Sequence, residues 1–295
     1  MAEKTRLTTE EFLSLWNDDN NTLAPGIKID VVECLVQQRS SQYLIDAKER
    51  AMKVMKLDQF EDSQQVKILD LGCGLGIDLI LVAEEAVRLG KTVSIIGLEI
   101  NPILIEEAKK LYELKKHCLT SNVSIEIVHG DIRQMAFHDR TFDIVRCDLC
   151  LEHVDLSKAL LEIKRVLKVN GRLIALEDGA GNVYSSDEVL IKTYDSILSS
   201  RRDGGTAIGL QFMLPNMDFD IICLIPEPFL QSAQEITRND KDWIKLRALG
   251  ESMVTKGVLT EEENKDFCKR FIEACGANRI IVAAMLFVIE AVKQK

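Results

Sequence analysis

The sequence predicts an α/β fold built on a doubly wound, Rossmann-like, mostly parallel sheet of seven strands. The short apolar run 66–71 has the pattern of a buried strand, and a glycine-rich turn and a helical pattern over 78–89 follow it. Further apolar runs then alternate with helical patterns up to residue 178. Because this alternation of near-continuous apolar strands with helices requires a sheet covered on both faces, it favours parallel strands.

Each predicted element of this core has its own signal. Pro102 stands in a first helical turn, where its missing N–H costs nothing, and Asn170-Gly171 is expected to end a helix. Strands are predicted at 66–71, 92–98, 123–128, 142–147, 172–176, 219–224 and 280–288. Helices are predicted within 29–57 and at 78–89, 102–116, 156–168, 187–199, 231–237, 240–256 and 261–274.

The turn after the first strand contains Gly72, Gly74 and Gly76. Glycines at such a turn let the backbone bend sharply and let a ligand approach without a Cβ in the way. The helix behind the turn offers free N–H groups to an anion or carboxylate. The GxGxG spacing differs from the GxGxxG that cradles a pyrophosphate, which disfavours an NAD(P)-dependent oxidoreductase. The next strand ends at Glu99, about the spacing at which a carboxylate meets a ribose.

Composition restricts the class of protein. With 295 residues, 46% hydrophobic and 28% charged, the chain can form one large α/β domain with additions. A net charge of −10 disfavours a nucleic-acid partner. The polar N-terminus and the lack of a long apolar run predict no signal peptide and no membrane partner. The eight cysteines then indicate reduced thiols, so a cytoplasmic location is expected.

Five motifs together carry a family resemblance: LDLGCGLG (69–76), GLE (97–99), GDI (130–132), FDIVRCDLCLEHV (142–154) and LLEIKRVLKVNGRLIALED (160–178). They resemble the class I S-adenosylmethionine-dependent methyltransferases, most closely the small-molecule branch that includes the quinone-biosynthesis methyltransferases. The resemblance is close over roughly residues 40–180. It implies S-adenosylmethionine as the cofactor, which leaves as S-adenosylhomocysteine, and a small-molecule substrate.

The resemblance also implies a domain organisation. Residues 1–60 would form an N-terminal helical cap, and residues 61–295 the S-adenosylmethionine-binding methyltransferase domain. A substrate-recognition insertion, or lid, is expected at about 179–218, between the fifth and sixth strands. The seventh strand would pair antiparallel at the edge of the sheet.

Carried over to this sequence, the resemblance assigns the ribose and the methionine part of the cofactor. The two carboxylate oxygens of Glu99 would accept both ribose hydroxyls. Gly72, Cys73 and Gly74 would lie along the methionine part through their backbone. Asp70 would orient that turn or the ammonium group.

The adenine and the two ends of the methionine part have further candidates. Asp131 would accept a hydrogen bond from the adenine amino group, with Ile132 and Ile100 against the ring faces. Asp148, just past the fourth strand, is a candidate for the ammonium group. Arg39 is a candidate for the cofactor's carboxylate.

Methyl transfer from a sulfonium starts with an activated leaving group, so the protein mostly supplies position, orientation and a dry pocket. His153, in the loop after the fourth strand, is a candidate general base because imidazole titrates near neutral pH; fixing that loop is an equal alternative. Glu177, at the end of the fifth strand, is a candidate to bind the acceptor or to act as base. Quinone-pathway O-methyltransferases carry a similar LEHV with a metal-binding acid three residues before its glutamate. Leu149 stands at that position here, so no metal site is predicted.

Two questions stay open at the level of sequence. Cys147 and Cys150 form a CxxC, for which buried thiols are the preferred interpretation over a zinc or redox site, since no second CxxC follows. The favoured function is methyl transfer to a small organic acceptor, such as a secondary metabolite or a quinone-like compound. The alternative is an S-adenosylmethionine-binding protein that has lost methyl transfer and serves as a binding module or a cyclase-type enzyme.

Overall fold

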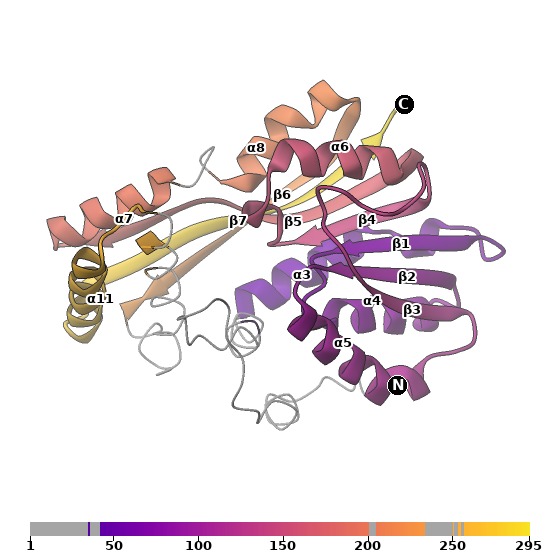
Figure 1. Cartoon of the computed structure of the whole chain (residues 1–295), viewed down its shortest axis with the longest axis horizontal. Coiled ribbons are helices and arrows are strands. Elements are labelled where there is room, and N and C mark those ends of the chain that lie inside the picture. The colour runs from indigo at the N-terminus through magenta and orange to yellow at the C-terminus, as the bar shows by residue number, and fades with distance from the viewer. Residues whose placement is uncertain (1–34, 36–41, 201–204, 234–249, 251–252, 255–256) are drawn as a thin grey trace. The chain divides into compact units, whose positions relative to one another are not determined.

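The computed structural model describes residues 35, 42–200, 205–233, 250, 253–254 and 257–295 (Figure 1). The strands are β1 (Gln65–Leu71), β2 (Thr92–Glu99), β3 (Val123–His129), β4 (Phe142–Asp148), β5 (Leu167–Ser185), β6 (Phe219–Ser232) and β7 (Ile280–Lys293). The α-helices are α3 (Gln42–Val54), α4 (Ile77–Arg88), α5 (Pro102–Lys115), α6 (Leu156–Val166), α7 (Glu188–Ser200), α8 (Thr206–Met213) and α11 (Glu261–Gly276). Short 3-10 turns are η1 (Leu57–Gln59), η2 (Lys116–Cys118), η3 (Leu151–His153) and η5 (Pro215–Met217).

The seven strands form one sheet in the order β3-β2-β1-β4-β5-β7-β6. Strands β1 to β5 pair in parallel, with Ile68 of β1 opposite both Ile95 of β2 and Ile144 of β4. The predicted doubly wound, mostly parallel sheet is therefore confirmed. Because parallel strands end at the same edge, the loops after β1, β2 and β4 lie together at that edge.

Strand β7 runs antiparallel to β5. Gly179 of β5 lies beside Phe287, whereas Gly181 lies beside Ala284, so the residue numbers run in opposite directions. The expected direction is thus correct, but the expected position is wrong, since β7 lies between β5 and β6 and the edge belongs to β6. Strand order depends on long-range pairing, which an apolar run does not encode.

The chain divides into two compact units. One contains residues 1–45, 184–197 and 231–281, and the other contains residues 46–183, 198–230 and 282–295. Within the first, Tyr194 of α7 stacks on Phe267 of α11, with ring centroids 6.5 Å apart. The second holds β1 to β4 and most of the remaining strands. The predicted boundary between a cap and a methyltransferase domain at residue 60 stays a prediction.

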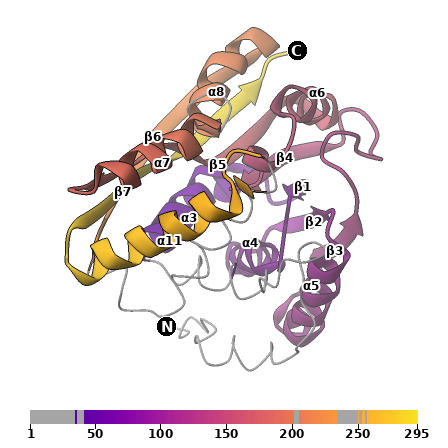
Figure 2. The same ribbon diagram turned by 60° about the vertical axis from the view of Figure 1, so that its left-hand side comes forward.

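The hydrophobic core of the sheet lies on both of its faces. On one face, α6 and α8 pack on β1, β4 and β5; Leu69, Val145 and Leu173 are fully buried there. On the other face, Leu79 of α4 packs so tightly on Gly97 of β2 that a Cβ at Gly97 would approach it to 2.7 Å. Figure 2 shows α4 and α6 on opposite sides of the strands. Burial on both faces explains why the strands read as near-continuous apolar runs.

The start of β5 differs from the expectation. Helix α6 ends at Val166, and Leu167 is already extended, so the helix is shorter than the predicted 156–168. Asn170-Gly171 lies inside β5, where Asn170 has a φ of 62°. The register with β4 shifts at this point. The Asn-Gly pair therefore forms an irregularity within a strand and not a helix end, because Leu167 gains burial by joining the sheet.

Other differences concern length and the insertion. Strands β5, β6 and β7 all extend well beyond their predicted ends at residues 176, 224 and 288. Helix α8 lies in the segment 179–218, for which only the helix at 187–199 was expected. The predicted helix at 231–237 is wrong at its start, because Gln231 and Ser232 belong to β6. Ala233 is helical, while 234–237, most of 240–256 and most of the pattern before residue 42 lie outside the described residues.

The C-terminal end of α6 provides a test of the fold. Lys293 of β7 is buried, and its Nζ donates to the carbonyl oxygens of Lys164 and Leu167, at 2.7 Å each. Replacing Lys293 with Met should lower the free energy of unfolding by about 1.5–3 kcal/mol, since two carbonyls lose a charged donor. Urea denaturation measures this loss. Lys295→Met, at an exposed residue of the same segment, is the control and should change stability by less than about 0.5 kcal/mol; equal effects would contradict the assignment.

Candidate functional site

The glycine-rich turn after β1 has the backbone that its sequence predicts. Gly72, Gly74 and Gly76 have φ values of 61°, 53° and 72°, a region that favours glycine. A Cβ at Gly72 would approach the Cβ of Cys150 to 2.7 Å. The N–H of Cys73 donates to the carbonyl of Leu98, at 3.2 Å, which ties the turn to the end of β2. The turn therefore presents backbone to a ligand in a fixed conformation.

Beside this turn lies a buried group of charges that we call the ion cluster, made of Asp70 at the end of β1, Asp78 in the first turn of α4, Arg146 and Asp148 of β4, and Lys48 of α3. Arg146 contacts Asp148 and lies 3.6 Å from Asp70 and 3.8 Å from Asp78. Lys48 bridges Asp78 at 2.8 Å and Asp148 at 3.0 Å. Three carboxylates therefore face two cations.

The ion cluster contains carboxylate oxygens that accept no hydrogen bond from the described residues. Asp70 is 3% exposed and Arg146 is 2% exposed. Among the described residues, neither Oδ2 of Asp70 nor Oδ1 of Asp148 has a hydrogen-bond partner. Burial raises the pKa of the Asp70 carboxyl to about 7, and the guanidinium of Arg146 only partly offsets this rise. A buried carboxyl with a free oxygen at a strand end can receive a cationic donor.

Glu99 ends β2 and is also buried. Its Oε2 accepts the N–H of Gly74 at 3.0 Å, and its Oε1 accepts the N–H groups of Ile100 and Asn101 at 2.9 Å each. The side chain therefore connects the glycine-rich turn to the start of α5. A carboxylate has about four acceptor positions, so these three contacts leave one, on Oε2, for a hydroxyl donor.

Asp131 follows β3, and both of its oxygens are held by Arg133, with the Nη2–Oδ2 contact at 2.6 Å. These hydrogen bonds lower the pKa of Asp131 below its ordinary value, so the side chain is an ionised acceptor. Ile132 is buried, whereas Ile100 is exposed. The loops after β2 and β3 adjoin, since the N–H of Gly130 donates to the carbonyl of Glu99 at 3.0 Å.

The two catalytic candidates lie in contrasting surroundings. His153, in η3, is 71% exposed in its side chain, with Nε2 3.5 Å from Oε1 of Glu152. Glu177 is 0% exposed. Its Oε1 accepts the N–H groups of Cys150 at 3.3 Å and Leu151 at 3.1 Å. Burial raises its pKa well above the ordinary value. Glu177 therefore fixes the loop after β4, and a role as base for either residue stays a prediction.

Sequence reasoning missed three of the five residues of the ion cluster, namely Arg146, Asp78 and Lys48. Arg146 was detectable, because a charged residue in the middle of an apolar strand needs buried partners. Asp78 stands in a first helical turn, where an acid is ordinary. Lys48 gives no signal, since it is one lysine of a surface-type helical pattern. Arg39 lies outside the described residues.

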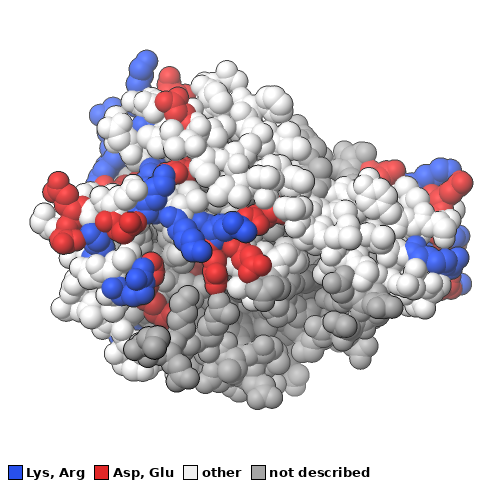
Figure 3. All heavy atoms as spheres, turned by 180° about the vertical axis from the view of Figure 1, so that it is seen from behind, with Lys and Arg blue, Asp and Glu red and all other residues white. Residues whose placement is uncertain are grey.

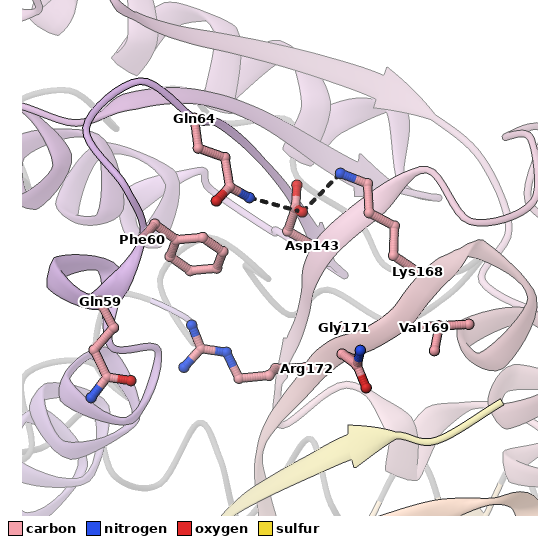
Figure 4. Close-up of a pocket in the computed structure, with 9 residues that line it drawn as sticks. Gln59, Phe60, Gln64, Asp143, Lys168, Val169, Gly171 and Arg172 are labelled. Atoms are coloured by element: carbon pink, nitrogen blue, oxygen red, sulfur yellow. Dashed lines mark hydrogen bonds and ion pairs between the residues drawn. The ribbon is translucent and has the colours of Figure 1, made fainter.

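A cavity of about 330 Å³ lies elsewhere, near the amino ends of β1, β4 and β5 (Figure 4). Arg172 sits over the ring of Phe60, 5.0 Å from its centroid, and Lys168 pairs with Asp143 at 2.7 Å. Gln64 also reaches Asp143, at 3.5 Å. The charges here are already paired, and the ion cluster lies at the opposite edge of the strands.

The surface charges are mixed. In α5 and just after it, lysines pair with glutamates one turn away, as in Lys110–Glu107 at 2.7 Å and Lys116–Glu113 at 2.5 Å. Figure 3 shows a face on which acidic and basic side chains are intermingled. Of the helices described, none combines the length and apolar character needed to cross a membrane.

Comparison with known proteins agrees with this geometry. Residues 69–175 match the family described as a methyltransferase domain. The chain is 37% identical over 109 residues to the mitochondrial ubiquinone biosynthesis O-methyltransferase of Schizosaccharomyces pombe, a match covering 37% of this chain and 36% of the relative. It is 33% identical over 113 residues to the demethylmenaquinone methyltransferase of Staphylococcus aureus, covering 38% and 43%. The match thus spans less than half of either relative.

A solved structure shares the fold. An S-adenosylmethionine-dependent methyltransferase from Methanosarcina mazei superposes with a TM-score of 0.51 at 18% identity, covering 82% of this chain and 96% of that one. Residues 69–175 therefore match a methyltransferase domain in sequence, and the fold is the one that class I S-adenosylmethionine-dependent methyltransferases share. The resemblance in the sequence motifs is confirmed.

The ion cluster makes a prediction about stability. Arg146→Met should lower the free energy of unfolding by about 3–5 kcal/mol, because three buried carboxylates lose their central cation. The loss should be smaller at about pH 5 than at about pH 8, since protonation then removes the uncompensated charge. Denaturant unfolding at both pH values measures it. Arg133→Met, at an exposed side chain, is the matched control; a loss as small as the control's would contradict the role of Arg146.

Proposed function

We propose that this protein binds S-adenosylmethionine at the carboxyl edge of its sheet and transfers the methyl group to a small organic acceptor. The observation that carries the proposal is the pair of free, buried carboxylate oxygens on Asp70 and Asp148 beside the glycine-rich turn. An α-ammonium group is a donor of the charge and size that such oxygens accept. The residues present therefore fit the cofactor.

The other contacts follow the strand ends. Glu99 would accept the ribose hydroxyls, while Gly72, Cys73 and Gly74 would lie along the methionine part with no side chain between backbone and ligand. Ile132 and Ile100 would enclose the adenine. Asp131 would accept a hydrogen bond from the adenine amino group in place of one of its contacts with Arg133. Arg133 would keep this acceptor ionised and oriented.

Methyl transfer requires few further groups from the protein. The cofactor supplies an activated methyl group on a sulfonium. The chain's own residues would exclude water and hold donor and acceptor in line. Glu177 would position the loop after β4, and His153 in that loop would take a proton from a hydroxyl or amine acceptor.

The acceptor class rests on the relatives and on charge. One relative is named as a ubiquinone biosynthesis O-methyltransferase and another as a demethylmenaquinone methyltransferase, which favours a quinone-like or phenolic acceptor. The net charge of −10 disfavours RNA. We retain a cytoplasmic location and a role in secondary metabolism as predictions.

A methyl-release assay tests the proposal. The protein would be incubated with S-adenosylmethionine labelled at the methyl carbon and a panel of catechols, hydroquinones and amines. Label in an acceptor, with equimolar S-adenosylhomocysteine, is the expected result. Tight cofactor binding with no transfer to any of these acceptors would favour the non-transferring alternative. No binding to either form of the cofactor would contradict the proposal.

Glu99 should dominate ribose recognition. Glu99→Ala removes the proposed ribose acceptor and the support of the glycine-rich turn, so the affinity for S-adenosylhomocysteine should fall at least about 30-fold, or roughly 2 kcal/mol. Calorimetric titration measures this affinity. Glu106→Ala, on the exposed side of α5, is the control and should bind as the wild type does. An unchanged affinity in Glu99→Ala would remove Glu99 from the site.

Binding should also depend on pH through Asp70. The pKa of Asp70 is raised to about 7, and a bound ammonium favours its charged form, so affinity should fall as pH falls through 7. The groups facing Asp70 are Arg146, Asp148, Asp78 and Lys48. From about pH 8 to about pH 6 the wild-type affinity for S-adenosylhomocysteine should drop about tenfold. Asp70→Asn should bind more weakly and with a flat profile; a flat wild-type profile would contradict the assignment.

A further inference from the structure

The end of β4, the loop that follows it and β5 bring two thiols and a carboxyl group together. Cys147 is in β4, Cys150 is in the loop, and Glu177 is in β5. The two sulfur atoms and one Glu177 oxygen all lie within 4.8 Å of one another. All three side chains are buried. The sequence shows only the CxxC, because Glu177 stands 27 residues beyond Cys150 and reaches it through strand pairing.

Glu177 provides an observation independent of the cysteines. Its Oε1 is used by the loop N–H groups, but its Oε2 is buried and has no hydrogen-bond partner in the described part of the chain. The charged groups with most influence on it, Glu152 and Asp178, are themselves acidic. Leaving a buried polar atom without a hydrogen-bond partner destabilises the folded state. A cation between Glu177 and the two sulfurs would remove this cost.

The donor set selects the kind of cation. Two sulfur ligands exclude magnesium and calcium, which take oxygen ligands, and favour a thiophilic ion. Zinc binds thiolate sulfur at about 2.3 Å and carboxylate oxygen at about 2.0–2.2 Å, so its ligands lie roughly 3.5–3.8 Å apart. Ligand atoms already within 4.8 Å need only small side-chain adjustments to reach this spacing.

We propose that Cys147, Cys150 and Glu177 bind a zinc ion. The ion takes the place of the two thiol protons, which are released to solvent, and the fourth zinc position is left to a water molecule. A disulfide between the two cysteines fits less well, since buried neutral thiols react slowly and the bond would leave Glu177 without a partner.

The ion would stabilise the edge of the sheet at which we propose that the cofactor binds. It would tie β4 to β5 and fix Cys150, whose side chain packs on Gly72 of the glycine-rich turn. This proposal departs from the expectation of no metal site, which rested on Leu149 at the position of the family's metal-binding acid, and from the interpretation of the CxxC as two buried thiols. It goes beyond the proposed function and is tested separately, because zinc content and cofactor binding are different measurements.

The test begins with metal content. The full chain is produced in zinc-supplemented medium and dialysed against metal-free buffer, and zinc is then measured by plasma mass spectrometry. The wild type should retain about one zinc per chain, and the Cys147→Ser/Cys150→Ser variant should retain almost none. Cys275→Ser, at another buried cysteine, is the matched control and should retain zinc as the wild type does.

Affinity and spectra complete the test. Metal-free wild type should take zinc from a chromophoric chelator, and cobalt(II) should produce a thiolate-to-metal absorption band. Glu177→Gln should keep this band, because both thiolates remain, but should bind at least tenfold more weakly. Wild type that holds no more zinc than the double cysteine variant, or that contains a Cys147–Cys150 disulfide, would overturn the proposal. The chelator competition on wild type decides the matter even if the double variant fails to fold.

Discussion

Arg146 is the constraint on which the candidate site depends. A guanidinium in the middle of an apolar strand is tolerable only with carboxylates around it, and β1, α4 and the end of β4 each supply one. Lys48 adds a second cation from α3. Because three carboxylates face only two cationic side chains, carboxylate oxygens remain free to accept hydrogen bonds. They lie beside the glycine-rich turn, where a cationic ligand would bind.

The parallel sheet decides where this chemistry lies. Since β1, β2 and β4 end at one edge, Asp70, Glu99 and Asp148 come together although they are far apart in the chain. The turn at Gly72 is then fixed from two sides, by the backbone contact of Cys73 with Leu98 and by the packing of Cys150. The same loop after β4 receives Glu177 from β5. The proposed cofactor-binding edge of the sheet and the proposed zinc site therefore share the loop after β4.

Local patterns predicted the alternating core well, because strands such as 66–71 and helices such as 102–116 depend on short-range signals. They failed where contacts with distant segments determine the structure, as at Asn170-Gly171, in the position of β7 within the sheet and in the length of β5. The site followed the same division. Glu99 and Asp131 were proposed as cofactor ligands from motif position, whereas Lys48 and the contact of Glu177 with Cys150 arise from the tertiary fold. Local sequence patterns do not show which distant side chain pairs with a buried charged group.

The measurement that tests the central claim most directly compares two ligands in two proteins. S-adenosylhomocysteine carries the α-ammonium group, and 5′-methylthioadenosine lacks the whole amino-acid part. If the ion cluster receives the ammonium, Asp70→Asn should weaken binding of the first at least about tenfold, or 1.4 kcal/mol, and leave the second nearly unchanged. Equal losses for both ligands, or no loss for either, would contradict the account.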